Sequence, residues 1–231
     1  MKATLEYIEP LSPTVHTFWF RPEKPVDNVP GQFTELYLPH QNPDDRGQKR
    51  WFTIYSSPTE ELFAITTKII SECSSFKKAL QAIKPGAQLN FAEPMGDFIL
   101  PVDKAIPLVF VAGGIGVTPF RSIIRWLHDK NEARNIQLLY AAHDESELIE
   151  RDLFDKLQTQ YMLSQPSPTW SGLTGQLTAS KIQELVTAND RTHVYLSGPE
   201  KMVEIITKDL ITDGLPKHQV ITDYFPGYDK L

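Results

Sequence analysis

Residues 109–119 read VFVAGGIGVTP, and this stretch decides what kind of sheet the chain builds. The apolar run over residues 108–112 is typical of a strand buried on both faces. It passes into a turn with three glycines, and helical spacing begins at Pro119. Glycines let backbone N–H groups approach a pyrophosphate, and the following helix N-terminus adds partial positive charge. Because the G-x-G-x-x-G spacing is absent, the stretch predicts either a phosphate loop or simply a tight strand-to-helix turn.

Working outward from this loop, the rest of the C-terminal half alternates strands and helices. Such alternation predicts an α/β fold with a doubly wound parallel sheet over residues 101–231. The expected strands cover residues 108–112, 136–141, 193–196 and 219–222, and the expected helices cover 119–130, 148–158, 179–187 and 200–213.

The first hundred residues have a different pattern, with short β-branched and aromatic runs separated by proline and glycine turns. Closely spaced strands of this kind predict a small antiparallel β-barrel over residues 1–100. The expected strands cover residues 15–21, 32–38, 51–55, 62–70 and 88–92, and a short helix is expected over 74–83. The sequence thus predicts two domains with a boundary near residue 100.

Composition narrows the possible functions. The chain has 231 residues and a formal charge of −6, and the resulting acidity argues against nucleic acid as the main partner. Its one cysteine, Cys73, excludes an internal disulfide and cannot by itself hold zinc or an iron–sulfur cluster. No metal site is predicted, so redox chemistry would need a bound organic cofactor or Cys73 itself. Without an apolar run long enough for a signal peptide or a membrane span, a soluble cytoplasmic protein is expected.

Two segments of the first half could bind a dinucleotide that carries a flat ring. Residues 50–58 read RWFTIYSSP, in which the arginine could clamp a diphosphate. Phe52 or Tyr55 could stack on the ring and Thr53 could hydrogen-bond to it. The alternative is a half-buried strand with a surface arginine. Residues 71–76, SECSSF, could form an anion site at a helix N-terminus or could merely cap the helix.

A second glycine turn lies in the C-terminal half, where residues 195–199 read YLSGP. Parallel-sheet enzymes bind ligands at the carboxyl ends of strands, so this turn and the first could border one cleft. The alternative is a helix start, with Ser197 as N-cap and Pro199 in the first turn.

Taken in order, these motifs resemble those of the ferredoxin–NADP reductase superfamily over nearly the whole chain. Three of them depart from the family pattern, with Phe52 for Tyr, Ser71 for Gly and Ser197 for Cys. The matching segments are residues 30–33 (PGQF), 50–53 (RWFT, for R-x-Y-[ST]), 71–74 (SECS, for G-x-x-S), 112–119 (AGGIGVTP), 197–199 (SGP, for C-G-x) and 223–225 (DYF).

The resemblance implies an FAD-dependent oxidoreductase that transfers hydride between NAD(P)H and FAD. Electrons would then pass to a separate acceptor, which could be a protein such as ferredoxin or flavodoxin or a small molecule. Two alternatives remain open. The chain could be a flavin-bearing electron-transfer subunit of a larger complex without independent turnover, or a nucleotide-binding regulatory module without flavin.

The resemblance also implies roles for individual residues. Arg50 and Ser74 would bind the FAD diphosphate, Phe52 would pack on the isoalloxazine and Thr53 would bond near N5. Residues of the hydride path would be Thr53, Ser197 and Phe225, and serine in place of cysteine predicts slower or retuned transfer rather than its loss. The full cofactor-binding set is Arg50, Phe52, Thr53, Ile54, Tyr55, Lys68 and Ser74 for the flavin, and Gly113, Gly114, Gly116, Thr118, Pro119, Gly198 and Pro199 for the nicotinamide nucleotide.

Two further points concern single residues. Asp144 and Glu145 follow the second predicted sheet strand, where acidic residues favour the bare ribose of NADH. Cationic side chains at Arg121, Arg125 and Arg151 could still reach the 2′-phosphate of NADPH, so the sequence favours NADH only slightly. Cys73 stands at a helix start, which can lower a thiol pKa, but a small packed residue is the favoured interpretation.

Overall fold

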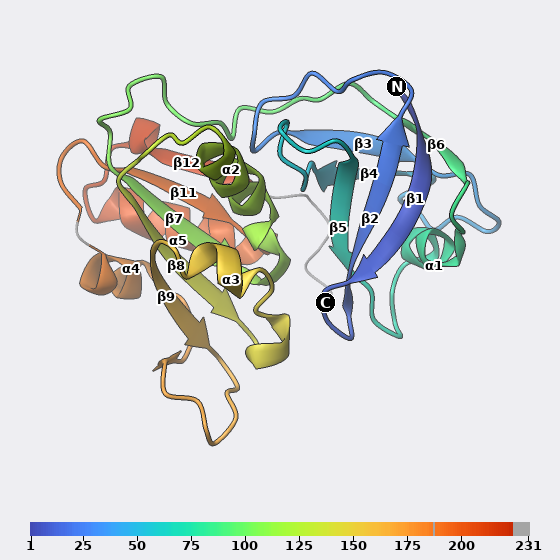
Figure 1. The fold of residues 1–231 in the computed structure, drawn as a ribbon. Coiled ribbons are helices and arrows are strands. Elements are labelled where there is room, and N and C mark those ends of the chain that lie inside the picture. The colour runs from blue at the N-terminus through green and yellow to red at the C-terminus, as the bar shows by residue number, and fades with distance from the viewer. Residues whose placement is uncertain (187, 224–231) are drawn as a thin grey trace. The chain divides into compact units, whose positions relative to one another are not determined.

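The computed structural model describes residues 1–186 and 188–223, and the chain forms two compact units, Met1–Ile99 and Leu100–Leu231 (Figure 1). The first contains an antiparallel sheet and one α-helix, and the second contains a parallel sheet with helices on both faces. No helix in the described residues is long and apolar enough to cross a membrane.

The first unit is the predicted antiparallel barrel. Its strands run in the order β4-β3-β6-β1-β2-β5, and a bridge between Ile54 and Ile65 joins the two ends of the sheet. The strand β1 is not predicted from the sequence, because a bulge between Leu5 and Tyr7 interrupts its alternation. The strands are β1 (Lys2–Pro10), β2 (Val15–Pro22), β3 (Phe33–Tyr37), β4 (Lys49–Thr53), β5 (Phe63–Lys68) and β6 (Gln88–Phe91).

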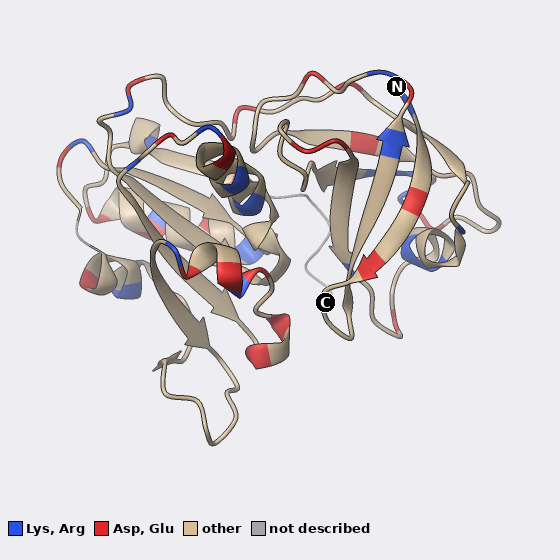
Figure 2. Cartoon of the chain, in the orientation of Figure 1, with Lys and Arg blue, Asp and Glu red and all other residues tan. Residues whose placement is uncertain are grey.

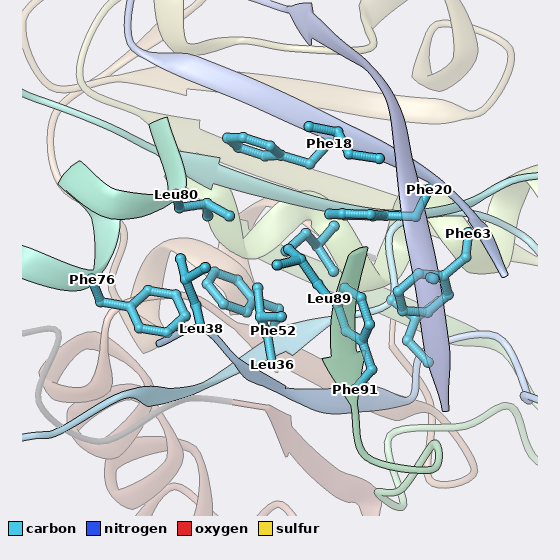
Figure 3. Packing of buried hydrophobic residues seen from close by; sticks show 14 of the residues in the cluster. Phe18, Phe20, Leu36, Leu38, Phe52, Phe63, Phe76, Leu80, Leu89 and Phe91 are labelled. Carbon is cyan, nitrogen blue, oxygen red and sulfur yellow. The ribbon is translucent and has the colours of Figure 1, made fainter. Parts of the chain in front are cut away.

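The barrel core is built by alternate residues of these strands and is covered by the predicted short helix, α1 (Ser75–Ala82). Ser74 caps the helix, because its hydroxyl accepts a hydrogen bond from the Lys77 N–H. The helix buries Phe76 and Leu80 against the barrel, and Figure 3 shows Phe76 beside Phe52 within this core. The helix start is thereby fixed next to β4.

The second unit is the predicted doubly wound sheet, with parallel strands in the order β10-β9-β8-β7-β11-β12. One face packs on α2 through Phe110 and Phe120, whose ring centroids lie 4.6 Å apart, and the opposite face packs on α4 and α5. Its elements are β7 (Leu108–Gly113), the 3-10 turn η1 (Gly114–Val117), α2 (Thr118–Asp129), β8 (Ile136–Ala142), η2 (Glu145–Glu147), α3 (Arg151–Phe154), β9 (Gln158–Leu163), β10 (Leu173–Thr174), α4 (Ala179–Leu185), β11 (His193–Ser197), α5 (Glu200–Thr212), η3 (Lys217–Gln219) and β12 (Val220–Asp223).

The helix expected over residues 148–158 is wrong in most of its length. Only one turn, α3, is helical, and Gln158 already begins β9, a strand that the sequence analysis does not predict. Glu150 adopts a left-handed backbone with φ of 59°, which interrupts any longer helix. The buried Tyr140 hydroxyl donates to the Glu147 carbonyl at 2.9 Å and accepts from the Ile149 N–H at 3.3 Å, so this segment is held in a non-helical path.

The strand order places the topological switch point between β7 and β11. The chain moves from β7 outward to β8 and β9 and then returns to the other side of β7 as β11. Ala112 lies in register with Ser197, so the two glycine turns leave the sheet side by side. A Cβ on Gly116 would collide with the Ser197 carbonyl and the Gly198 nitrogen. The two turns therefore pack backbone against backbone, which only glycine permits here.

This contact predicts that Gly116→Ala will be far more damaging than a substitution at Gly114. Gly114 has φ of 52° and open space around its Cα, so alanine there should cost about 1–2 kcal/mol of unfolding free energy through backbone strain alone. Gly116→Ala must also separate the two turns, and we expect a loss of roughly twice that or more. Urea unfolding of both variants measures the difference, and equal losses would contradict the packing described.

Candidate active site

Arg50 is held inside the first unit beside the start of α1. It is only 8% exposed, and its Nη2 donates to Asp44 Oδ1 at 2.6 Å. Its Nη1 donates to the carbonyls of Arg46, Gly47 and Lys49, and its guanidinium lies 5.1 Å from the centre of the Phe76 ring. The surface-arginine alternative therefore does not hold.

This arrangement changes the pKa of Asp44. Its partial burial acts to raise the pKa of the carboxyl, but the hydrogen bonds and positive charges of Arg50 and, to a smaller extent, Arg46 together outweigh that effect and hold the pKa below its usual range. Asp44 also donates its N–H to the Ser75 hydroxyl at 3.0 Å, and His40 contacts the same hydroxyl at 3.1 Å. The loop before β4 is thus tied to the first turn of α1, which brings the predicted pair Arg50 and Ser74 to one place.

Lys77 is the residue of this place that sequence analysis missed. It lies in the first turn of α1 and is 7% exposed, although lysine is rarely buried. Burial lowers the pKa of Lys77 to about 8; the field of Cys73 opposes this shift, and the positive charges of Arg46, Lys68 and Arg50 add to it. The only sequence signal is its position three residues after the N-cap Ser74. Several cations and a helix N-terminus therefore meet at one edge of the barrel, which suits an anion.

The predicted ring contacts of the first unit are mostly buried. Phe52 is 4% exposed and lies in the core 6.0 Å from Phe76, and Tyr55 is fully buried 6.2 Å from Trp19. Ile54 is buried in the same core as Phe52. Thr53 ends β4 and is 6% exposed, with its side chain on the face opposite to Phe52 because strand residues alternate.

Lys68 and Cys73 complete this edge. Lys68 is the last residue of β5 and its charge acts on Lys77, so it lies with the cations around α1. Cys73 is half-buried and packs against the barrel core, which agrees with its interpretation as a packing residue.

In the second unit the glycine loop is shaped as a turn between β7 and α2. Gly114 takes the positive φ that the turn needs, and Gly113 packs against Met202 and Pro199. The Thr118 hydroxyl donates to the Ile115 carbonyl at 3.1 Å, so it braces the loop. Pro119 lies in the first turn of α2, where a missing N–H costs nothing. The predicted loop residues are thus together at the carboxyl end of β7.

Ser197 ends the neighbouring strand, β11, and is 3% exposed. Its register partners are Ala112 of β7 and Asp223 of β12, so one row across the sheet edge carries a glycine loop, a serine and a buried carboxyl group. A Cβ added to Gly198 would lie 3.2 Å from the Cα and the backbone nitrogen of Gly113. The two predicted turns are therefore in close contact. Phe225 lies outside the described residues.

The segment after β8 is acidic, as Figure 2 shows for η2. Asp144 caps this turn, and its carboxylate accepts hydrogen bonds from Ser146 N–H and hydroxyl, which lower its pKa despite some opposing desolvation. Glu145 accepts from Ser167, and that bond lowers the pKa of Glu145. Both groups therefore stay ionised at neutral pH at the carboxyl edge of the sheet.

Two of the arginines weighed for a phosphate have carboxylate neighbours in the structure. Arg121 is buried in the first turns of α2, with its Nε 3.9 Å from Glu150 Oε1. Arg125 pairs with Asp129 along the same helix at 3.0 Å. Arg151 lies over the Tyr161 ring at 5.0 Å.

The depressed pKa of Lys77 predicts how the stability of the nucleotide-stripped protein changes with pH. Between about pH 8 and 10.5 the unfolded chain keeps a proton on Lys77 that the folded protein has lost, so the unfolding free energy should rise with pH. The full rise is on the order of 3 kcal/mol. Lys77→Met should remove this increment, whereas Lys78→Met on the exposed neighbour should not.

Denaturant unfolding of the wild type and both variants at pH 7.5 and 10 measures this difference, because other titrating groups are shared by all three proteins. Parallel pH dependence in the wild type and Lys77→Met would contradict the burial of a charged lysine at this position.

Comparisons with known proteins show similarity to oxidoreductases. Residues 110–208 match the oxidoreductase NAD-binding domain family. The chain is 29% identical to ferredoxin–NADP reductase B of Sorangium cellulosum (strain So ce56) over 221 residues, 89% of this chain and 88% of that protein. It is 26% identical to the phenol hydroxylase P5 protein of Acinetobacter pittii (strain PHEA-2) over 97% of this chain and 65% of that protein.

Solved structures show the same fold. The FAD/NAD-binding domain of nitric oxide dioxygenase from Vibrio cholerae O1 biovar El Tor superposes with a TM-score of 0.80 at 21% identity and covers 97% of this chain and 98% of that chain. The chain spans 65% of the phenol hydroxylase P5 protein and 57% of flavohemoprotein A from Dictyostelium discoideum, so several relatives are longer. Residues 110–208 thus match the oxidoreductase NAD-binding domain family, and over most of its length the chain is similar in sequence and fold to ferredoxin–NADP reductase-like oxidoreductases.

Proposed function

We propose that this protein is an FAD-dependent oxidoreductase that transfers hydride between NAD(P)H and FAD and passes electrons to a separate acceptor. Residues 1–100 would form the FAD-binding domain and residues 101–231 the NAD(P)-binding domain. The observation that carries the proposal is the packing of two glycine turns at the switch point of the parallel sheet, because that is where doubly wound folds bind nucleotides.

The edge of the barrel at α1 fits the diphosphate of FAD. Arg50 and Lys77 are buried cations, Lys68 adds a third charge, and Ser74 caps the helix N-terminus. Because burial disfavours the charge on Lys77, a bound diphosphate would relieve that penalty and raise the pKa of Lys77 again. FAD, when bound, supplies the chemistry of accepting a hydride and releasing single electrons.

The remaining residues would position and enclose the reacting groups. The Thr53 hydroxyl would bond near the flavin N5. Phe52 and Ile54, which point into the barrel core on the other side of the strand, would support the site from within. Tyr55, packed with Trp19, would add apolar surface on the side of Thr53. Ser197 would lie along the hydride path with Phe225. Serine is polar and similar in size to cysteine but lacks a polarizable sulfur, so we expect a slower or retuned transfer rather than a lost one.

NADH is the preferred nucleotide in this proposal. Asp144 and Glu145 stay ionised after β8, where the adenosine ribose of a bound dinucleotide lies in doubly wound folds. A carboxylate there can bond a ribose hydroxyl but repels a 2′-phosphate. Arg121 and Arg125, which could otherwise attract that phosphate, each have a carboxylate neighbour.

A second candidate follows from the length comparison. Relatives include the glycine betaine monooxygenase reductase subunit of Chromohalobacter salexigens, of which the chain spans 57%. This chain could therefore work as the flavin-bearing electron-transfer subunit of a larger complex, without independent turnover. In both readings the acceptor is a separate partner, such as ferredoxin, flavodoxin or a small molecule. A reducing cytoplasm suits a chain whose one cysteine is a thiol.

The decisive experiment is an absorbance spectrum of the purified protein before and after anaerobic addition of NADH or NADPH. We expect a yellow protein whose flavin bands bleach within seconds with NADH and more slowly with NADPH. A yellow protein that neither nucleotide bleaches would favour the electron-transfer subunit. A colourless protein that releases no FAD would overturn the proposal and support a regulatory module.

Arg50→Ala should weaken FAD retention by at least tenfold, because the variant loses a buried cation at the diphosphate edge. Lys49→Ala is the matched control, since Lys49 is exposed and pairs only with Glu35 among the ion pairs described. FAD released on denaturation measures retention, and thermal unfolding reports any loss of the Asp44 contacts. Equal FAD content in Arg50→Ala and wild type would rule out the clamp.

A further inference from the structure

The outer face of β3 and β4 carries a group of exposed apolar side chains that the proposed function does not use. Three of the seven exposed large apolar residues in the described part of the chain lie here: Trp51 at 43%, Met95 at 39% and Tyr37 at 38%. With Phe33 they form what is called here the β3/β4 aromatic face.

Strand register places these four side chains together. Phe33 and Tyr37 point to the same side of β3, as residues four apart in a strand do. Trp51 stands opposite Glu35, between them, and its ring lies 6.0 Å from the ring of Phe33. Met95 exchanges both backbone hydrogen bonds with Phe33 at 2.9 Å. The face is therefore one continuous surface.

The backbone at Gly96 leaves room for one ring of this face. A Cβ on Gly96 would lie 2.8 Å from the Phe33 ring, so the ring rests directly on a glycine with φ of 108°. The opposite side of the same strands, with Leu36 and Phe52, is the barrel core. The aromatic side chains thus stay outside although the interior side of the strands is apolar as well.

The face is electrically neutral. Glu35 and Lys49 lie within it, and they neutralise each other through a 2.8 Å ion pair. A partner that matches this surface must therefore present an apolar, uncharged contact rather than a charged one.

The size of the face suits a transient contact. Its exposed side chains offer a few hundred Å² at most, given about 150–250 Å² for a whole large aromatic side chain. A stable interface needs about 800 Å² on each partner, whereas encounters between redox proteins are smaller. The position also fits, because Trp51 precedes Thr53 by two residues, about 7 Å along the strand.

From these observations we infer that the β3/β4 aromatic face is the docking surface for a protein electron carrier whose contact surface is apolar and uncharged. The inference rests on the proposed function. The overall step would be NADH plus two oxidised one-electron carriers giving NAD⁺, one proton and two reduced carriers. Trp51 would serve association with the carrier and would take no part in the reduction of the flavin by NADH.

The test compares Trp51→Glu with Trp51→Phe and with Tyr7→Ala, which removes an exposed ring from β1. A [2Fe–2S] ferredoxin and cytochrome c serve as protein acceptors, and ferricyanide serves as the small acceptor. We expect Trp51→Glu to lower kcat/KM for a protein acceptor at least tenfold, with Trp51→Phe and Tyr7→Ala within twofold of wild type. Bleaching by NADH and ferricyanide reduction should stay unchanged in Trp51→Glu, whose Tm should fall slightly because the new carboxylate faces Glu35 across the strand pair. Wild-type rates should vary less than threefold between 20 and 500 mM salt.

Several results would overturn the inference. These are unchanged protein-acceptor rates in Trp51→Glu, a steep fall of the wild-type rate with salt, or reduction of ferricyanide but of neither protein. An equal loss with ferricyanide would assign Trp51 to the flavin site instead. A wild-type dimer that Trp51→Glu makes monomeric in sedimentation would make a second copy the occupant. Failure of NADH to bleach the wild type would refute the proposed function itself, and this inference with it.

Discussion

The contact between the two glycine turns is the constraint on which the carboxyl edge of the parallel sheet depends. β7 and β11 are adjacent and in register, so their loops leave the sheet at the same level and compete for the same space. Both loops fit because Gly116 has no side chain. The backbone of Ser197 and Gly198 occupies the space that a Cβ on Gly116 would need. The neighbouring turn therefore requires glycine at position 116, in a loop that lacks the G-x-G-x-x-G spacing.

The barrel edge is organised by charge rather than by close backbone packing. Arg50 is fixed by Asp44 and three carbonyl groups, and Lys77 is buried in the same region with its pKa lowered. Crowding cations at a helix N-terminus opposes folding unless an anion is bound, since each cation disfavours the charge of the others. The acidic segment after β8 has the opposite sign, and its carboxylates are stabilised by hydroxyl and backbone donors. The proposed diphosphate site at α1 is therefore positively charged, whereas the proposed ribose site after β8 is negatively charged.

Sequence reasoning succeeded where local signals were strong and failed where distant contacts decided. The buried run of β7, the glycine turn and the cap at Ser74 each carry their structure in a few neighbouring residues. The helix expected over 148–158 does not form because the Tyr140 hydroxyl, on β8, hydrogen-bonds to the backbone of Glu147 and Ile149. β9 was missed for the same reason, since QTQYML alternates weakly and becomes a strand by pairing with β8.

The sequence by itself determined the two fold classes, the switch between them near residue 100 and the motifs that resemble the ferredoxin–NADP reductases. Periodicity, glycine and capping residues act over a few positions, so they can be read without the fold. Only the tertiary structure decided that Arg50 turns inward to Asp44, that Lys77 is buried beside it and that Trp51, rather than Phe52, is exposed. Side-chain direction, burial and pKa depend on which distant segments surround a residue, and those neighbours exist only once the sheets have formed.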